Sequence, residues 1–207
     1  MKLLLASNNQ KKLRELARIL EGLEIQLVLP REIGGIPEVE EDQPDFAGNA
    51  RKKALHAARS SGMWALADDS GLEVEALGGA PGVYSARYAG THGDDAANNA
   101  KLLRELEGVP AERRGARFVC ALALSRPDGS IALEVLGTAR GRILSAARGT
   151  HDFGYDPLFE FTEDGFSETG RGFAELEPEQ KARVSHRGRA LREFAKKLPS
   201  VVNPRSA

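Results

Sequence analysis

The residues best suited to chemistry are two adjacent carboxylates, Asp68 and Asp69. They follow the apolar run Met63–Ala67, which is typical of a short buried strand, and they precede Ser70-Gly71, which we expect to form a turn. A strand that ends in two acids would hold both carboxylates at a rigid edge, and oxygen ligands of this kind suit a hard divalent cation. An Asp-Asp pair also occurs in solvated turns, so these residues alone leave both interpretations open.

A second polar cluster lies between the first expected strand, Leu3–Ala6, and the first expected helix. Backbone amides at a helix N-terminus attract anions and the helix dipole adds to this, while Lys12 would supply a mobile positive charge. The cluster lacks the glycines of a Walker loop. An ordinary helix cap with solvated lysines explains it equally well. Its members are Ser7, Asn8, Asn9, Gln10, Lys11 and Lys12.

Three further polar clusters follow along the chain. An acidic run extends from Glu38 to Asp45, the segment Phe153–Pro157 reads Phe-Gly-Tyr-Asp-Pro, and Lys181 is followed by Ser185-His186-Arg187. A charge run is usually a solvated face. Phe153 and Tyr155 could be core aromatics, and we expect one of them to pack inward.

Taken in order with Asp68-Asp69-Ser70-Gly71, these clusters resemble the inosine triphosphate pyrophosphatase family over nearly the whole chain, from Leu3 to Leu191. Each motif is weak alone, but the ordered set is specific. Members of this family are house-cleaning hydrolases of non-standard purine nucleoside triphosphates. The resemblance implies hydrolysis of ITP, dITP and XTP to a monophosphate and pyrophosphate, with Mg²⁺ as the cofactor and a homodimer as the assembly.

The resemblance also implies roles for individual residues. Asp69 matches the catalytic carboxylate, and Glu41 and Asp69 match the magnesium ligands, with Glu40 as the alternative if the loop register differs by one. Lys53 would meet a phosphate oxygen, although an exposed helix lysine is the plain alternative. The substrate-binding set implied in this way is Ser7, Asn8, Asn9, Gln10, Lys11, Lys12, Lys53, Ser70, Phe153, Gly154, Tyr155, Asp156, Lys181, His186 and Arg187.

Base recognition is implied at the C-terminal clusters. Phe153 would stack on the purine and Asp156 would read its edge, while Lys181, His186 and Arg187 would complete the base pocket. A purine with oxygen at position 6 presents an acceptor there, which donors on His186 or Arg187 could satisfy. Adenine presents an amino donor instead and would leave those groups unpaired.

The hydrophobic pattern predicts the elements that must position these residues. Strands are expected at Leu3–Ala6 and Ile25–Leu29, and helices at about Leu13–Leu20, ended by Gly22, and from Phe46 to Gly62. The acidic loop between them, from Pro30 to about Pro44, is long enough to be a functional candidate. This β–α–β–α–β order implies parallel strand pairs with helices packed against them.

The later part of the chain predicts a different pairing. Arg117–Arg126 and Ile131–Arg142 are strand patterns joined by the hairpin signal Pro127-Asp128-Gly129. A last helix should begin at Ser185 or His186, with residues 199–207 frayed. We therefore expect an α/β fold with a mixed β-sheet and flanking helices, forming one nucleotide pyrophosphatase domain over residues 1–207, with two lobes around a central substrate cleft.

Composition limits the function classes. Among 207 residues, 29 basic and 30 acidic side chains give a net charge of −1, which disfavours a nucleic-acid-binding protein. The only cysteine, Cys120, excludes an intramolecular disulfide and fits a small buried hydrophobe. The apolar run after Met1 is too short for a signal sequence, and no stretch approaches the roughly 20 apolar residues of a membrane span. We therefore expect a soluble, cytoplasmic protein with no membrane partner.

Two other functions remain open alternatives. One is a pyrophosphatase of the septum-formation-inhibitor type that acts on other modified or pyrimidine nucleotides. The residues His186-Arg187 and the Phe-Gly-Tyr-Asp motif favour the purine enzyme over this alternative. The other is a sensor that binds a nucleotide without turnover. Glu41, Asp68 and Asp69 speak against a sensor, because acids beside phosphates help only where a metal is bound.

Overall fold

The structure is a computed structural model that describes residues 1–150 and 153–202. The chain divides into two compact units. The first unit consists of Met1–Asp69, Ala121–Leu136 and the segment from Ala190 onward, and the second unit consists of Ser70–Cys120 and Gly137–Arg189.

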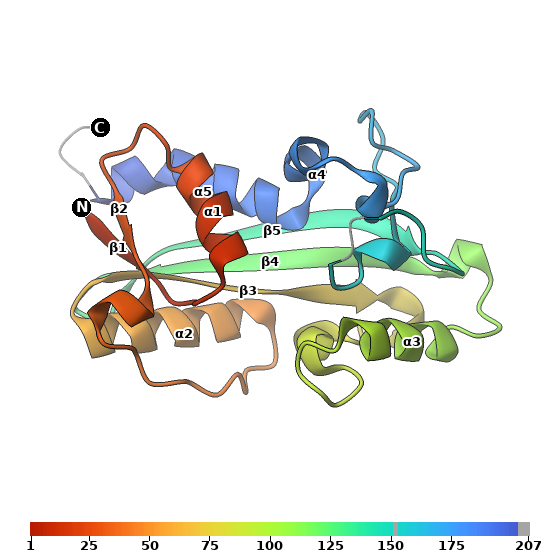
Figure 1. Ribbon diagram of the computed structural model, residues 1–207, viewed down its shortest axis with the longest axis horizontal. Helices are drawn as coiled ribbons and strands as arrows, with labels where there is room; N and C mark the ends of the chain where they lie inside the picture. The colour runs from red at the N-terminus through yellow and green to blue at the C-terminus, as the bar shows by residue number, and fades with distance from the viewer. Residues whose placement is uncertain (151–152, 203–207) are drawn as a thin grey trace. The chain divides into compact units, whose positions relative to one another are not determined.

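Helices and strands alternate in the first part of the chain, and a strand pair follows (Figure 1). The strands are β1 (Lys2–Leu5), β2 (Gln26–Val28), β3 (Trp64–Val74), β4 (Gly115–Ser125), β5 (Ile131–Ile143) and β6 (Phe159–Phe161). The α-helices are α1 (Gln10–Ile19), α2 (Phe46–Ser61), α3 (Asp95–Glu105), α4 (Pro178–Val184) and α5 (His186–Val202).

The strands form a six-stranded sheet in the order β2-β1-β3-β4-β5-β6. β1 pairs in parallel with β2 and with β3, whereas β5 and β6 are antiparallel. The hairpin between β4 and β5 closes through a hydrogen bond from the Arg126 amide to the Ser130 carbonyl (2.8 Å). The sheet is therefore mixed, which confirms the predicted fold class.

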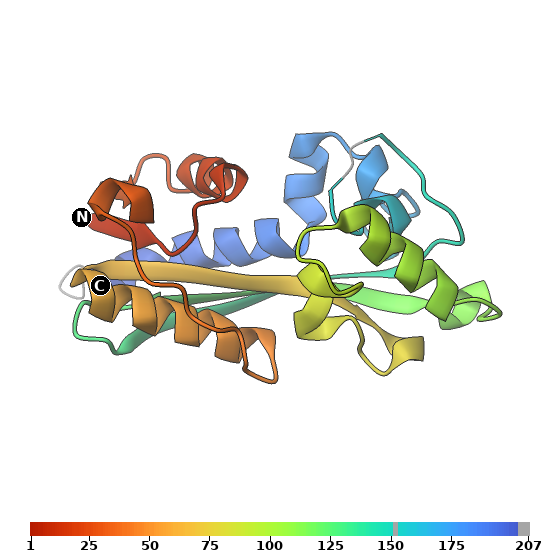
Figure 2. The same cartoon turned by 60° about the horizontal axis from the view of Figure 1, so that its bottom comes forward.

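Helix α2 lies alongside the sheet of the first unit (Figures 1 and 2) and is capped at both ends. Asp45 accepts a hydrogen bond from the Gly48 amide at the N-terminus, and Gly62 takes the left-handed conformation at the C-terminus (φ 66°). Four of the buried residues of this helix are alanines, Ala50, Ala54, Ala57 and Ala58, and their small side chains let the helix approach the strands closely. Ala57 and Ala58 pack with Leu4, Val28 and Ala65.

Two predictions about element ends are wrong. The strand expected at Met63–Ala67 does not end at a Ser70-Gly71 turn, because β3 runs on to Val74. Leu72 and Val74 are fully buried, so the chain stays extended to bring both into the core of the second unit. The fraying expected from residue 199 is also absent up to Val202, since Leu198 is fully buried and Pro199 lies in the last turn of α5. Residues 203–207 lie outside the described part of the chain.

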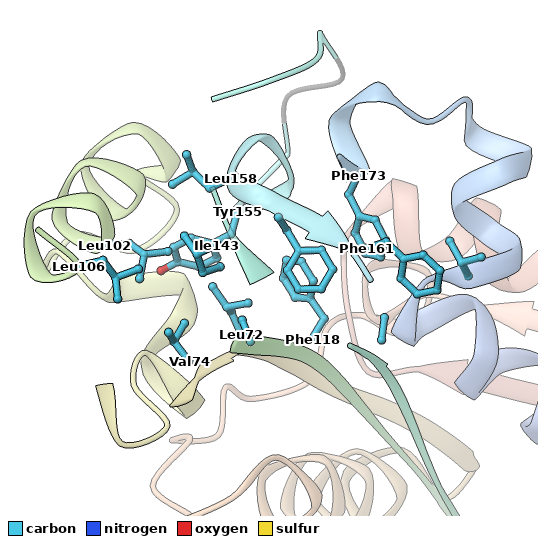
Figure 3. Packing of buried hydrophobic residues seen from close by; sticks show 14 of the residues in the cluster. Leu72, Val74, Leu102, Leu106, Phe118, Ile143, Tyr155, Leu158, Phe161 and Phe173 are labelled. Carbon is cyan, nitrogen blue, oxygen red and sulfur yellow. The ribbon is translucent and has the colours of Figure 1, made fainter. Parts of the chain in front are cut away.

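The core of the second unit contains a group of aromatic rings among aliphatic side chains (Figure 3). Phe118, Phe159 and Phe173 are mutual neighbours, with ring centroids 4.7–5.7 Å apart. Leu102 of helix α3 and Leu106, which caps its C-terminus, belong to the same cluster. Cys120, at the centre of β4, is fully buried, as its sequence context predicts. In the described ranges, no helix has the length and apolar character required to cross a bilayer.

Candidate functional site

The two adjacent aspartates of β3 are buried, and each has a lysine partner in the first unit. Asp68 and Asp69 are both 8% exposed. Lys12 Nζ donates to Asp68 Oδ1 (2.7 Å), and Lys53 Nζ donates to Asp69 Oδ1 (3.0 Å). Lys12 reaches Asp68 from α1 and Lys53 reaches Asp69 from α2. Neither lysine is therefore the purely solvated side chain that the plain alternative would require.

Glu41, rather than Glu40, contacts the lysine that pairs with Asp69. The Glu41 carboxylate accepts a hydrogen bond from Lys53 Nζ at 2.7 Å, whereas Glu40 is exposed. Glu41 and Asp69 thus share a single ammonium group, although 28 positions separate them in the chain (69 minus 41). The long acidic loop therefore folds back on β3 at the residue that the family pattern selects.

Burial and the neighbouring charges act in opposite directions on the pKa values of Asp69 and Lys53. Burial raises the pKa of Asp69 above its ordinary value, and the charge of Lys53 only partly offsets this effect. For Lys53, burial would lower the pKa, but the negative charges of Asp69 and Glu41 outweigh it, so the pKa is raised. Lys53 therefore stays charged, while Asp69 is a stronger base than an exposed aspartate.

Asn49 is a site residue to which the sequence pattern assigned no role. Its side chain is fully buried. Asn49 Nδ2 donates to Asp69 Oδ2 (3.2 Å), and Asn49 Oδ1 accepts from the Gln43 amide (3.0 Å). One amide thus ties the acidic loop to Asp69. A polar residue one turn before Lys53, on a helix face otherwise made of alanines and Phe46, was the available signal for this role.

We expect Asn49→Leu to destabilise the protein by about 1–3 kcal/mol, because it leaves the Gln43 N–H without its buried acceptor. Chemical denaturation measures this loss. Gln43→Ala is the matched control: it keeps that N–H and removes only an exposed contact with Asp42, so its effect should stay below about 0.5 kcal/mol. Equal losses in both variants would contradict a bridging role for Asn49.

The polar segment before α1 caps that helix. Asn9 Oδ1 accepts from the Lys12 amide (3.3 Å), and Ser7 Oγ accepts from the Asn9 amide (3.2 Å). Asn8 is exposed. The ordinary capping role therefore holds for Asn9 and is compatible with anion binding. The side chains of Gln10 and Lys11, both predicted to bind substrate, lie outside the described part of the structure.

A second group of predicted site residues lies in the second unit. Lys181 Nζ forms an ion pair with the buried carboxylate of Asp156. The same ammonium lies 5.6 Å from the ring centroid of Phe153 and 5.7 Å from that of Phe173, within cation–π range. The structure therefore brings Phe153, Asp156 and Lys181 together.

The two aromatic residues of the Phe-Gly-Tyr-Asp motif differ in environment. Phe153 is 40% exposed, whereas Tyr155 is 5% exposed and donates its hydroxyl to the Ser85 carbonyl (2.9 Å). Burial, with Tyr88 and Asp95 nearby, raises the pKa of Tyr155 well above its usual range. Tyr155 is thus the aromatic that packs inward, whereas Phe153 stays partly exposed.

His186 and Arg187 form the first turn of α5. The His186 ring stacks on Phe118, with centroids 4.7 Å apart and 13° between the planes. His186, Arg187 and Ser70 are half-buried, and Ser70 follows Asp69 directly in β3. The aromatic stack fixes the orientation of His186.

The donor set of the first unit fits Mg²⁺. Glu41 and Asp69 present carboxylate oxygens to one shared cation, the Lys53 ammonium, and magnesium prefers such oxygen ligands. Within residues 1–150 and 153–202, no three His, Cys, Asp or Glu side chains form a metal-holding group. A metal that keeps its waters and uses phosphate oxygens needs only one or two carboxylates from the protein.

A mixed sheet with two buried aspartates, each paired to a lysine, defines an α/β protein with a charged cluster in its first unit. The chain belongs to the Ham1 family, whose sequence model matches residues 3–197. A relative from Desulforamulus reducens, described as a dITP/XTP pyrophosphatase, is 54% identical over 98% of this chain and 96% of its own length. A relative from Rhodopirellula baltica with the same description is 51% identical over 99% of this chain and 96% of its own length.

Solved structures agree with this assignment. A HAM1 protein from Coxiella burnetii superimposes with a TM-score of 0.87 at 40% identity, covering 96% of this chain and 98% of the other. A protein from Mycobacterium abscessus, described as a nucleoside-triphosphatase and dITP/XTP pyrophosphatase, has a TM-score of 0.79 at 47% identity. The superposition covers 94% of this chain and 98% of the other.

Proposed function

We propose that this protein is a magnesium-dependent pyrophosphohydrolase that converts ITP, dITP and XTP to the monophosphate and pyrophosphate. The observation that carries the proposal is the group in which Glu41 and Asp69 share Lys53 while Asp68 pairs with Lys12. Relatives at 54% and 51% identity described as dITP/XTP pyrophosphatases support the substrate class. As in the resemblance, we propose a homodimer in the cytoplasm, without nucleic-acid or membrane partners.

The residues of this site have distinct roles in the proposed reaction. Glu41 and Asp69 would hold Mg²⁺, which offsets the charge of the triphosphate when bound. Asp69, whose pKa is raised by burial, accepts a proton from the attacking water. The water oxygen forms a bond to the α-phosphorus, and the bond from this phosphorus to the oxygen bridging to the β-phosphate breaks. Pyrophosphate then leaves, and the proton remains on the Asp69 carboxylate.

The test is product analysis by anion-exchange chromatography with ITP, dITP, XTP and ATP as substrates. We expect inosine monophosphate and pyrophosphate from ITP, with little turnover of ATP or of pyrimidine triphosphates. Inosine diphosphate with orthophosphate would contradict the proposal, because it indicates cleavage at the terminal phosphate. Turnover of pyrimidine nucleotides would favour a septum-formation-inhibitor-type enzyme, and binding without turnover would favour a sensor.

Lys53 and Lys52 form a matched pair for testing the phosphate contact. Lys53 pairs with buried Asp69, whereas Lys52 pairs with the exposed Asp42 (2.7 Å). Lys53→Met should weaken binding of a non-hydrolysable ITP analogue by about 10-fold or more, since a charge-assisted contact contributes roughly 1.5–3 kcal/mol. Binding of inosine monophosphate should weaken less, and Lys52→Met should leave both affinities unchanged. Calorimetric titration that shows equal losses for Lys53→Met and Lys52→Met would place Lys53 away from the phosphates.

Glu41 and Glu40 form a second matched pair. Glu41→Gln removes one of the two carboxylates that share Lys53, so the Mg²⁺ concentration for half-maximal activity should rise about 10-fold or more, as for loss of a charged contact. Glu40→Gln changes an exposed side chain and should leave this concentration unchanged. Magnesium titrations of both variants decide between them. The opposite ranking would mean that Glu40 is the ligand.

A further inference from the structure

Helix α3 holds the residue at the centre of the Phe-Gly-Tyr-Asp motif by both of its backbone polar groups. Asp95 Oδ2 accepts from the Gly154 amide at 2.7 Å, and Asn99 Nδ2 donates to the Gly154 carbonyl at 2.8 Å. Asp95 and Asn99 are separated by four positions and therefore lie on one face of α3. We call this pair the α3 clamp. Neither residue belongs to a motif that the sequence predicts to be functional.

The clamp acts on a backbone position that few residues can adopt. Gly154 has a φ of +57°, in the left-handed region that favours glycine. On one side of it, Tyr155 is buried and tied to Ser85. On the other side, Phe153 is 40% exposed. With Tyr155 anchored and the Gly154 peptide held by α3, the direction in which Phe153 leaves the backbone is fixed.

Asn99 contributes less to stability than its contacts suggest. Its Oδ1 atom is buried and has no hydrogen-bond partner among the described residues. An unsatisfied buried acceptor is costly, and leucine would remove it. Leucine would also leave the Gly154 carbonyl without its donor, so the two effects on stability oppose each other. What asparagine adds is the donor to the Gly154 carbonyl.

The neighbouring Asn98 shows that only one face of α3 contacts Gly154. Asn98 Oδ1 accepts from the Ala89 amide (2.7 Å), so it holds a different segment of the second unit. Arg104, further along α3, is exposed. The face of α3 that carries Asp95 and Asn99 is thus the one directed at the motif.

We propose that Asp95 and Asn99 are positioning residues that determine purine specificity by fixing Phe153 through Gly154. This inference rests on the proposed function, in which Phe153 stacks on the purine base. Base stacking and edge recognition both depend on the ring plane, and a misplacement of about 1 Å can reduce turnover by roughly 10²-fold. Loss of the α3 clamp should therefore lower the ITP-to-ATP ratio of kcat/KM while changing the melting temperature little.

The experiment compares Asn99→Leu, Asp95→Ala and Asp95→Asn with wild type, and uses Arg104→Leu as the control on the same helix. For each chain, kcat/KM is measured for ITP and for ATP, together with the melting temperature and with hydrogen exchange of the amides from Gly154 to Leu158. In Asn99→Leu, we expect the ITP-to-ATP ratio to fall about 10-fold or more, with little change in the melting temperature and with faster exchange at Gly154.

Asp95→Ala should behave in the same way as Asn99→Leu. Asp95→Asn should retain most of the ratio, because its amide oxygen can still accept from the Gly154 N–H. Arg104→Leu should match wild type. An unchanged ratio and unchanged exchange in Asn99→Leu and Asp95→Ala would overturn the clamp, as would a ratio that falls only in proportion to a lower melting temperature.

Wild type separates the two proposals. If it hydrolyses ITP and the variants keep the wild-type ratio, only the clamp is contradicted. If wild type does not hydrolyse ITP, the proposed function is wrong, and so is the role of Asp95 and Asn99 in purine specificity. The exchange measurement then still shows whether α3 holds Gly154.

Discussion

Replacing Asp69 with asparagine should lower kcat for ITP by about 10²–10⁴-fold, the usual cost of removing a general base. The substitution keeps the size of the side chain but removes its charge, which Lys53 faces at 3.0 Å. It also places an amide against Asn49, whose own amide donates to Asp69 Oδ2. Steady-state kinetics at saturating Mg²⁺ measure the loss, and circular dichroism verifies that the fold is kept.

Asp68→Asn is the control for this prediction. Asp68 is as buried as Asp69 and pairs with Lys12, but it does not share a lysine with Glu41. We therefore expect a smaller loss of kcat in Asp68→Asn than in Asp69→Asn. If Asp69→Asn keeps more than roughly a tenth of the wild-type kcat, the proposed base is a different carboxylate.

Arg187→Ala should reduce kcat/KM for ITP steeply while leaving the slow reaction with ATP almost unchanged. A pocket built to hydrogen-bond one group rejects an analogue that lacks it by roughly 10⁴-fold, and this discrimination is what Arg187→Ala should remove. Parallel losses for ITP and ATP would show that Arg187 does not read the base. The backbone around Phe153–Asp156 would then be the next candidate.

His186 needs a different substitution because of its packing. Its ring stacks on Phe118 within the aromatic core, so His186→Ala would combine lost packing with lost recognition. His186→Phe retains an aromatic ring for the stack and removes both ring nitrogens. A fall in the ITP-to-ATP ratio in this variant, at an unchanged melting temperature, would identify His186 as a second donor to the base.

Local sequence signals predicted most of the first unit. The alanine-rich face of α2 and its glycine stop at Gly62 specify a helix that can lie close to a sheet. The family resemblance then pointed to Lys53 and Glu41, which the structure brings together through one ion pair. Whether these residues bind phosphate and magnesium stays a prediction.

Other features depend on partners distant in the sequence. Ser70-Gly71 has the composition of a turn, yet burial of Leu72 and Val74 keeps β3 extended. Helix α3 was not predicted, and the contact of Asn99 with Gly154 joins residues 55 positions apart. Asn49 likewise depends on a loop amide and on a strand carboxylate. No local pattern encodes such pairs, because the contacts exist only once the chain has folded.

The buried position of Cys120 makes this protein its own reporter of unfolding. The chain has a single thiol, and in the native state that thiol is fully buried in β4. A thiol reagent can therefore modify the chain only when this strand opens. Where reclosing is faster than modification, the labelling rate divided by that of the denatured chain gives the equilibrium constant for opening. Every variant described above could be ranked by this means without adding a probe, and nucleotide binding would be recorded as slower labelling.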